Sequence, residues 1–175
     1  MIMSPRLRRF TLVVHVTSSV GSLGAVGGFL TLAVAGLTSQ DAQVVRGVYP
    51  AMELITWRVI VPLVVVSLLT GLVSSLGTAW GLLRHYWVLV KLLLTLLTTI
   101  VLLLQTQPIA YMARVAAEAP FTPDAPHGLG ISLVIHAAGG LLVLLTATAL
   151  AVYKPPGMTR YGWRRQQARR VPSRP

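Results

Sequence analysis

The sequence predicts an all-α integral membrane protein, with four transmembrane helices in an antiparallel bundle and both termini in the cytoplasm. Hydrophobic residues make up 54% of the 175 residues and charged residues only 11%, whereas soluble domains average about 25% charged residues. Four long apolar segments are separated by short polar connections, and most basic residues stand at the ends of these segments. The net charge of +11 therefore reflects membrane topology, and we expect no nucleic-acid partner.

The four predicted spans cover residues 10–37, 54–76, 86–104 and 129–153. Each is near or above the roughly 20 residues that a helix needs to cross the hydrocarbon layer. Lipid offers backbone groups no hydrogen-bond partners, so we expect these spans to be helical. The first span contains "AVA" at residues 33–35, which resembles a signal-peptidase site, but its apolar region is longer than a signal peptide uses. We therefore expect it to be retained.

The charged residues predict the orientation of the chain. All four acidic residues lie on or beside the connections between spans one and two and between spans three and four: Asp41, Glu53, Glu118 and Asp124. Twelve of the 15 basic residues fall on one side of the predicted topology: Arg6, Arg8, Arg9, Arg84, Lys91, Lys154, Arg160, Arg164, Arg165, Arg169, Arg170 and Arg174. The positive-inside rule assigns that side to the cytoplasm. The strong preference for arginine over lysine, with abundant alanine, glycine, valine and leucine, suggests a bacterial inner (plasma) membrane.

The chain divides into a transmembrane domain, residues 1–155, and a basic tail, residues 156–175. We expect the tail to be flexible, cytoplasmic and in contact with anionic lipid. Within the bilayer, helices associate through small residues, and three spans carry such residues, among them Gly24 and Gly28 in the first and Gly71, Gly77 and Gly81 in the second. Packing within the fold explains most of them, and a membrane-protein partner or a second copy is the alternative. Pro62 predicts a kink in the second span.

Ionisable residues within a span are costly and are candidates for function. His15 lies six residues beyond Arg9, and Lys91 six residues beyond His85, so both are predicted to lie about 9 Å from the same membrane face. Imidazole is a common haem ligand, and a neutral amine can also bind iron. We therefore take both as candidate haem b ligands. Candidate pocket-lining residues on the face of His15 are Ser18, Ser19 and Ser22.

Two simpler interpretations stay open for this pair. Lys91 would then extend its ammonium to the headgroups, and His15 would be a hydrogen-bonded packing residue. A second polar layer is predicted in the outer part of the membrane and contains Glu53, Arg58 and His136. There Arg58 either pairs with Glu53 or reaches the headgroups. The chain has no cysteine, which excludes disulfides, thiol catalysis and cysteine-bound metals, and we expect no metal-ion site.

Four motifs resemble those of a known group of membrane proteins. "VVHVTSSVGSLGAVGGFL" resembles the opening helix of the CopD/HemJ-like proteins, and "YPAMELITW" is similar to the acidic motif at their second helix. "HYWVLVKLLLT" resembles their W-x-x-x-K motif, with Trp87 and Lys91, and "LAVYKPPG" the end of their fourth helix. Over residues 8–157 the chain is similar to an uncharacterised bacterial four-helix family of predicted integral membrane proteins within this superfamily.

The resemblance implies a four-helix bundle and a b-type haem. In HemJ-like proteins a first-helix histidine and a third-helix lysine are the important pair, the activity is oxidation of protoporphyrinogen, and His15 and Lys91 occupy the matching positions. The fourth helix of those proteins carries an Asn-Glu pair near the place of His136 and Ala137. This departure argues against the oxidase activity more than against haem. CopD-like members are associated with copper tolerance, but the methionines here form no cluster.

Three functional hypotheses remain at this point. The first is a membrane protein of this superfamily, non-enzymatic or of unassigned activity, that binds haem b or a porphyrin between the first and third spans. The second is an oxidoreductase that resembles protoporphyrinogen oxidase or passes electrons to quinone. The third is a ligand-free accessory or assembly subunit, which binds its partners through the glycine faces and the tail.

Overall fold

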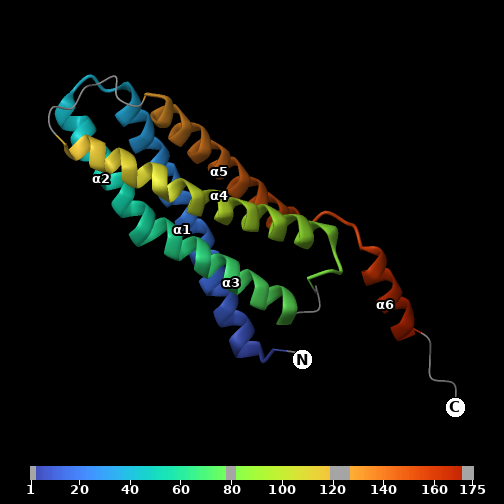
Figure 1. Cartoon of the computed structure of the whole chain (residues 1–175). Coiled ribbons are helices and arrows are strands. Elements are labelled where there is room, and N and C mark those ends of the chain that lie inside the picture. Colours follow the sequence, from blue (N-terminus) through green and yellow to red (C-terminus); the bar gives the residue numbers. More distant parts are fainter. Residues whose placement is uncertain (1–2, 78–81, 119–126, 171–175) are drawn as a thin grey trace, which may run out of the picture.

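The computed structural model describes residues 3–77, 82–118 and 127–170. It contains four helical segments that are long and apolar enough to cross a membrane: Pro5–Thr38, Ala42–Gly77, Tyr86–Ala117 and His127–Tyr153 (Figure 1). Each contains one of the four predicted spans, and the described residues form no β-strand. The prediction of an all-α protein with four spans is confirmed.

Local sequence signals set the ends of the first span. Helix α1 (Pro5–Thr38) begins at Ser4, whose hydroxyl accepts a hydrogen bond from the backbone N–H of Leu7, with proline following in the first turn. The chain turns at residues 39–41, where the Asp41 carboxylate caps the next helix by accepting from the Gln43 N–H at 2.8 Å. Only three residues therefore separate α1 from the second span.

The second span is one continuous helical segment with a change of pitch. It comprises α2 (Ala42–Ile55), the π-helical turn η1 (Thr56–Ile60) and α3 (Val61–Gly77). The wider turn comes directly before Pro62, which lacks an N–H and whose ring crowds the carbonyl one turn earlier. The Val61 N–H reaches back to the Thr56 carbonyl, the five-residue spacing of a π-bulge. The predicted disturbance at Pro62 takes this form.

Both connections that are predicted to lie outside contain helix beyond the predicted spans. Helix α4 (Tyr86–Ala117) continues through Pro108, although the predicted third span ends at residue 104. The reason is that two apolar stripes with spacing i, i+3, i+4, i+7 cover each other where α2 packs on α4. The stripe on α2 is Val45, Val48, Tyr49 and Met52, and the stripe on α4 is Ile109, Met112, Ala113 and Ala116. All eight residues are buried.

The four spans form a bundle in which α1 and α4 lie diagonally and do not pack directly against each other. Helix α1 packs against α3 and α5 (His127–Tyr153), and α4 packs against the same two helices. A side-chain contact between α1 and α4 must therefore cross the interior of the bundle. The Met3 N–H donates to the Gly77 carbonyl, and the Tyr86 N–H to the Gly157 carbonyl. The chain's start, the end of α3, the start of α4 and the end of α5 thus lie at one end (Figure 1).

The glycines serve different purposes. A methyl group added at Gly71 would lie 3.1 Å from the His15 ring, and one at Gly77 would lie 3.1 Å from Met3, so these two glycines permit close packing. A methyl group at Gly24 or Gly28 would meet nothing within 4 Å. The predicted use of these two for packing within the chain is therefore not observed. Gly81 lies outside the described residues.

The residues after α5 adopt a defined structure. Lys154 has a positive φ of 43°, a backbone conformation that ends α5 just before two prolines. The backbone N–H and the hydroxyl of Thr159 then donate to the carbonyls of Arg84 and Leu83. Helix α6 (Arg160–Arg170) follows and contacts the α3–α4 connection. Residues 160–170 of the predicted tail are thus helical, and hydrogen bonds at Thr159 hold the start of this helix. The flexibility of the tail stays a prediction.

Replacement of Gly162 tests how α6 is attached. A Cβ atom there would lie 2.5 Å from the Arg84 carbonyl oxygen, so we expect Gly162→Ala to displace α6 from the α3–α4 connection. Limited trypsin digestion in detergent should then cleave the tail several-fold faster than in the parent protein. Gly157→Ala is the matched control, since its Cβ would make an ordinary 3.8 Å contact with Tyr86. Equal cleavage rates in the two variants would contradict the packing described here.

Candidate functional site

The structure brings together the two residues that the sequence singles out. The Lys91 Nζ lies 3.3 Å from the His15 Nε2. His15 belongs to α1 and Lys91 to α4, so their contact crosses the interior of the bundle. Both residues are only partly exposed. The Lys91 amine points toward the imidazole of His15. The simpler interpretation of the sequence had the amine extending to the lipid headgroups instead.

Helix α3 fixes the orientation of the His15 ring. The His15 Nδ1 lies 2.9 Å from the Ser67 carbonyl oxygen and 3.2 Å from the Thr70 hydroxyl. A carbonyl only accepts hydrogen bonds, so Nδ1 carries the proton and Nε2 presents a lone pair to Lys91. Gly71 lies directly against the ring. Polar or small residues within about one turn of α3 thus hold an imidazole supplied by α1.

The three serines predicted to line a pocket make hydrogen bonds along α1 and between α1 and α3. The Ser18 hydroxyl donates to the His15 carbonyl at 3.1 Å, and the Ser22 hydroxyl to the Ser18 carbonyl at 2.8 Å. Both side chains are buried and satisfied by their own helix. The Ser19 hydroxyl lies 2.8 Å from that of Ser67 and joins α1 to α3. They support the position of His15 without lining the cavity described below.

The nitrogen atoms of His15 and Lys91 are of the kind that binds haem iron, but the distance between them is too short for both to bind one iron. A histidine whose Nδ1–H is held by a carbonyl and whose Nε2 is free of a proton is arranged as iron-binding histidines are. Two nitrogen ligands on opposite sides of one metal ion lie about 4 Å apart, since each bond is about 2 Å long. The observed 3.3 Å is a direct contact. Binding by both residues therefore requires the flexible Lys91 side chain to withdraw.

The predicted outer polar layer is not joined into one site. No ion pair or hydrogen bond links Glu53, Arg58 and His136 in the part of the chain that the structure describes. Arg58 is exposed within η1. His136 Nδ1 donates instead to the Ser132 carbonyl at 2.7 Å, within its own helix.

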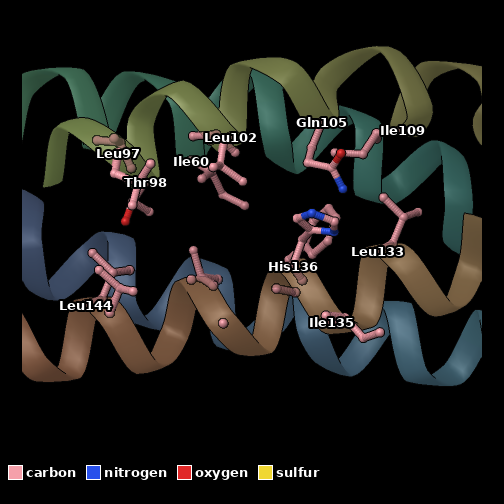
Figure 2. A pocket seen from close by; sticks show the side chains of 18 residues that line it. Ile60, Leu97, Thr98, Leu102, Gln105, Ile109, Leu133, Ile135, His136 and Leu144 are labelled. Carbon is pink, nitrogen blue, oxygen red and sulfur yellow. The ribbon is translucent and has the colours of Figure 1, made fainter. Parts of the chain in front are cut away.

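His136 lines a cavity that the sequence did not reveal. The cavity has a volume of about 360 Å³ and lies between α1, α3, α4 and α5. Figure 2 shows the Gln105 side chain of α4 and the His136 ring of α5 facing each other at one end, with aliphatic side chains along the rest. Gln105 lies one residue beyond the predicted third span, which ends at residue 104, so the sequence placed it in a connection. The apolar spacing from Ile109 to Ala116 was the signal that the helix continues.

Comparisons with known proteins do not assign the chain. It matches no family model, no curated protein and no solved structure. The resemblance to the CopD/HemJ-like proteins therefore stays a prediction. The described residues contain no group of three or more histidine, aspartate or glutamate side chains that could hold a metal ion.

Crowding at Gly71 tests whether the His15 ring is part of the packed interior. We expect Gly71→Val to lower the apparent melting temperature in detergent, because its side chain would collide with the ring and overpacking costs about 1–3 kcal/mol. Gly24→Val is the matched control, since it adds the same atoms on α1 where nothing lies within 4 Å. A similar loss in both variants would show that valine in the helix, and not His15, is responsible.

Proposed function

We propose that the protein is a non-enzymatic integral membrane protein that binds haem b or a porphyrin between α1 and α4. The supporting observation is the 3.3 Å contact between His15 Nε2 and Lys91 Nζ inside the bundle. Ionisable side chains are costly in a bilayer interior and mark a candidate functional site by default. A purely structural role would be served more cheaply by apolar side chains.

Each residue of the site has a role in this proposal. His15 would hold the iron through Nε2, while the Ser67 carbonyl keeps the proton on Nδ1 and the ring in position. Lys91 donates a hydrogen bond to Nε2 in the structure and would be the second residue that holds the group. Gly71 leaves room for the imidazole beside α3. When bound, haem supplies one-electron redox chemistry.

A ligand-free accessory subunit is the second candidate. One face of α1 supports it, because added methyl groups at Gly24, Gly27 and Gly28 would meet nothing within 4 Å. Small residues of this kind allow another helix to approach closely. In this case His15 and Lys91 only join α1, α3 and α4.

The proposed location is a bacterial inner membrane with both termini in the cytoplasm. Exposed basic residues gather at the end of the bundle where the chain starts and α6 contacts the α3–α4 connection: Arg6, Arg8, Arg9, Arg160 and Arg164. Such a collection of cations is favoured beside anionic lipid headgroups on the cytoplasmic side.

The visible spectrum of the purified protein tests the haem proposal. Protein produced in haem-replete cells and purified in mild detergent should show a Soret band. We expect His15→Ala to abolish the band, and Lys91→Ala to shift it or weaken it several-fold. His127→Ala is the matched control, because this histidine stands at the start of α5 outside the site.

Two results would overturn the assignment. Colourless protein from haem-replete cells, which also fails to take up added haem or porphyrin, would favour the accessory subunit. A band that survives His15→Ala but is lost in His136→Ala would place the ligand in the cavity beside α5.

The absence of native cysteine allows a clean test of orientation. Gln40→Cys and Pro156→Cys each place one thiol at an exposed position, at opposite ends of the bundle. In spheroplasts, a membrane-impermeant maleimide should label Cys at position 40 directly and at position 156 only after permeabilisation. The reverse pattern would place the termini outside the cytoplasm.

A further inference from the structure

The cavity between α4 and α5 is separate from the His15–Lys91 pair and has its own chemistry. Its walls are mostly apolar, with Val26 and Phe29 from α1 and Ile60 from η1 among the lining residues. Leu97 and Ile135 also line it, and their exposed fractions are 58% and 62%. The cavity therefore opens through the lipid-facing side of the bundle.

Two polar side chains at one end of the cavity lack partners on the sides that face each other. The Gln105 Nε2 is buried and has no hydrogen-bond partner in the described structure. His136 donates its Nδ1 proton to the Ser132 carbonyl, which leaves Nε2 as an acceptor. Figure 2 shows the amide and the imidazole directed toward each other across the cavity. A buried donor without a partner costs folding free energy, so this end is suited to a polar group from outside the chain.

We propose that this cavity binds the head group of an isoprenoid quinol. A single quinol hydroxyl accepts a hydrogen bond from the Gln105 amide and donates its own proton to His136 Nε2. The aliphatic walls cover the ring, and the isoprenoid tail leaves between α4 and α5 toward the lipid. The volume of about 360 Å³ lies within the range of roughly 300–1,000 Å³ that small-molecule sites occupy.

The residues that line the cavity favour an uncharged, planar ligand. No lysine, arginine, aspartate or glutamate lines the cavity, so the carboxylates of a haem or the phosphate of a lipid would lack a counter-charge there. Gly139 and Gly140 belong to the lining, and a methyl group added to either would meet nothing within 4 Å. A planar ring can therefore lie against the backbone of α5. This proposal does not depend on whether His15 and Lys91 bind haem.

Retention of a short-chain quinol tests the proposal. Purified full-length protein in detergent is incubated with ubiquinol carrying two isoprene units under argon, passed through a gel-filtration column and extracted, and the quinol is quantified by its ultraviolet absorbance. We expect about one quinol per chain at saturation, and weaker retention of the oxidised quinone, which has no hydroxyl proton for His136. Gln105→Leu and His136→Phe should each weaken binding about tenfold, the effect of one hydrogen bond.

Matched controls separate the cavity from general detergent effects. Gln107→Leu makes the same change two residues away, on an exposed position of α4 that does not line the cavity. Gly140→Leu fills the cavity while leaving Gln105 and His136 themselves unchanged, and it should abolish retention. Gly47→Leu adds the same side chain on the exposed face of α2. Far-ultraviolet circular dichroism and the elution volume verify the fold of each variant.

Two outcomes would overturn the proposal. Retention that is unchanged in Gln105→Leu, His136→Phe and Gly140→Leu would show that the quinol partitions only into the detergent. Equal retention of geranylgeraniol, with the same dependence on these residues, would assign the cavity to isoprenoid alcohols and remove the aromatic ring from the recognition. Loss of quinol binding leaves the Soret band of the His15 site unaffected, so the failure of either proposal is distinguishable from failure of the other.

Discussion

The structure depends on one constraint: inside a bilayer, every polar group must find its partner within the protein. The imidazole of His15 meets this constraint with a carbonyl and a hydroxyl of α3 on one side and an amine of α4 on the other. Serine and threonine hydroxyls along the spans meet it by donating to carbonyls three or four residues earlier. The Gln105 amide is the contrasting case, because its nitrogen is buried and unpaired.

This constraint explains why the spans could be predicted from the sequence. Apolar segments of the right length must be helical in lipid, so α1 and α5 were located to within a few residues. The pairing of His15 with Lys91 also followed from residue counting, because a helix converts sequence separation into depth. Depth alone says nothing about rotation around the helix axis, and the Ser67 carbonyl and Gly71 were found only in the structure.

Two features of the fold lay outside the sequence prediction for a common physical reason. The predicted third span ends at residue 104, but the stripe from Ile109 to Ala116 is buried against α2, and α4 stays helical to Ala117. Likewise, the start of α6 is held by hydrogen bonds from Thr159 to Arg84 and Leu83, which a charged composition cannot indicate. In both places the local conformation depends on contacts with residues that are distant in the sequence. A local sequence pattern gives no information about such contacts.

The paired stripes of α2 and α4 also make the two ends of the molecule differ in the side chains that fill their interiors. Most of the continuous hydrophobic core, from Phe29 and Met52 to Met112 and Leu133, lies toward the end where α2 covers α4. Around His15 and Lys91 the buried residues are few and mostly small or hydroxylated, such as Ser18 and Ser67. One end of the bundle is therefore filled by large apolar side chains, and the other is joined by hydrogen bonds between small and polar ones. A substitution that swaps these two kinds of side chain should therefore be tolerated differently at the two ends.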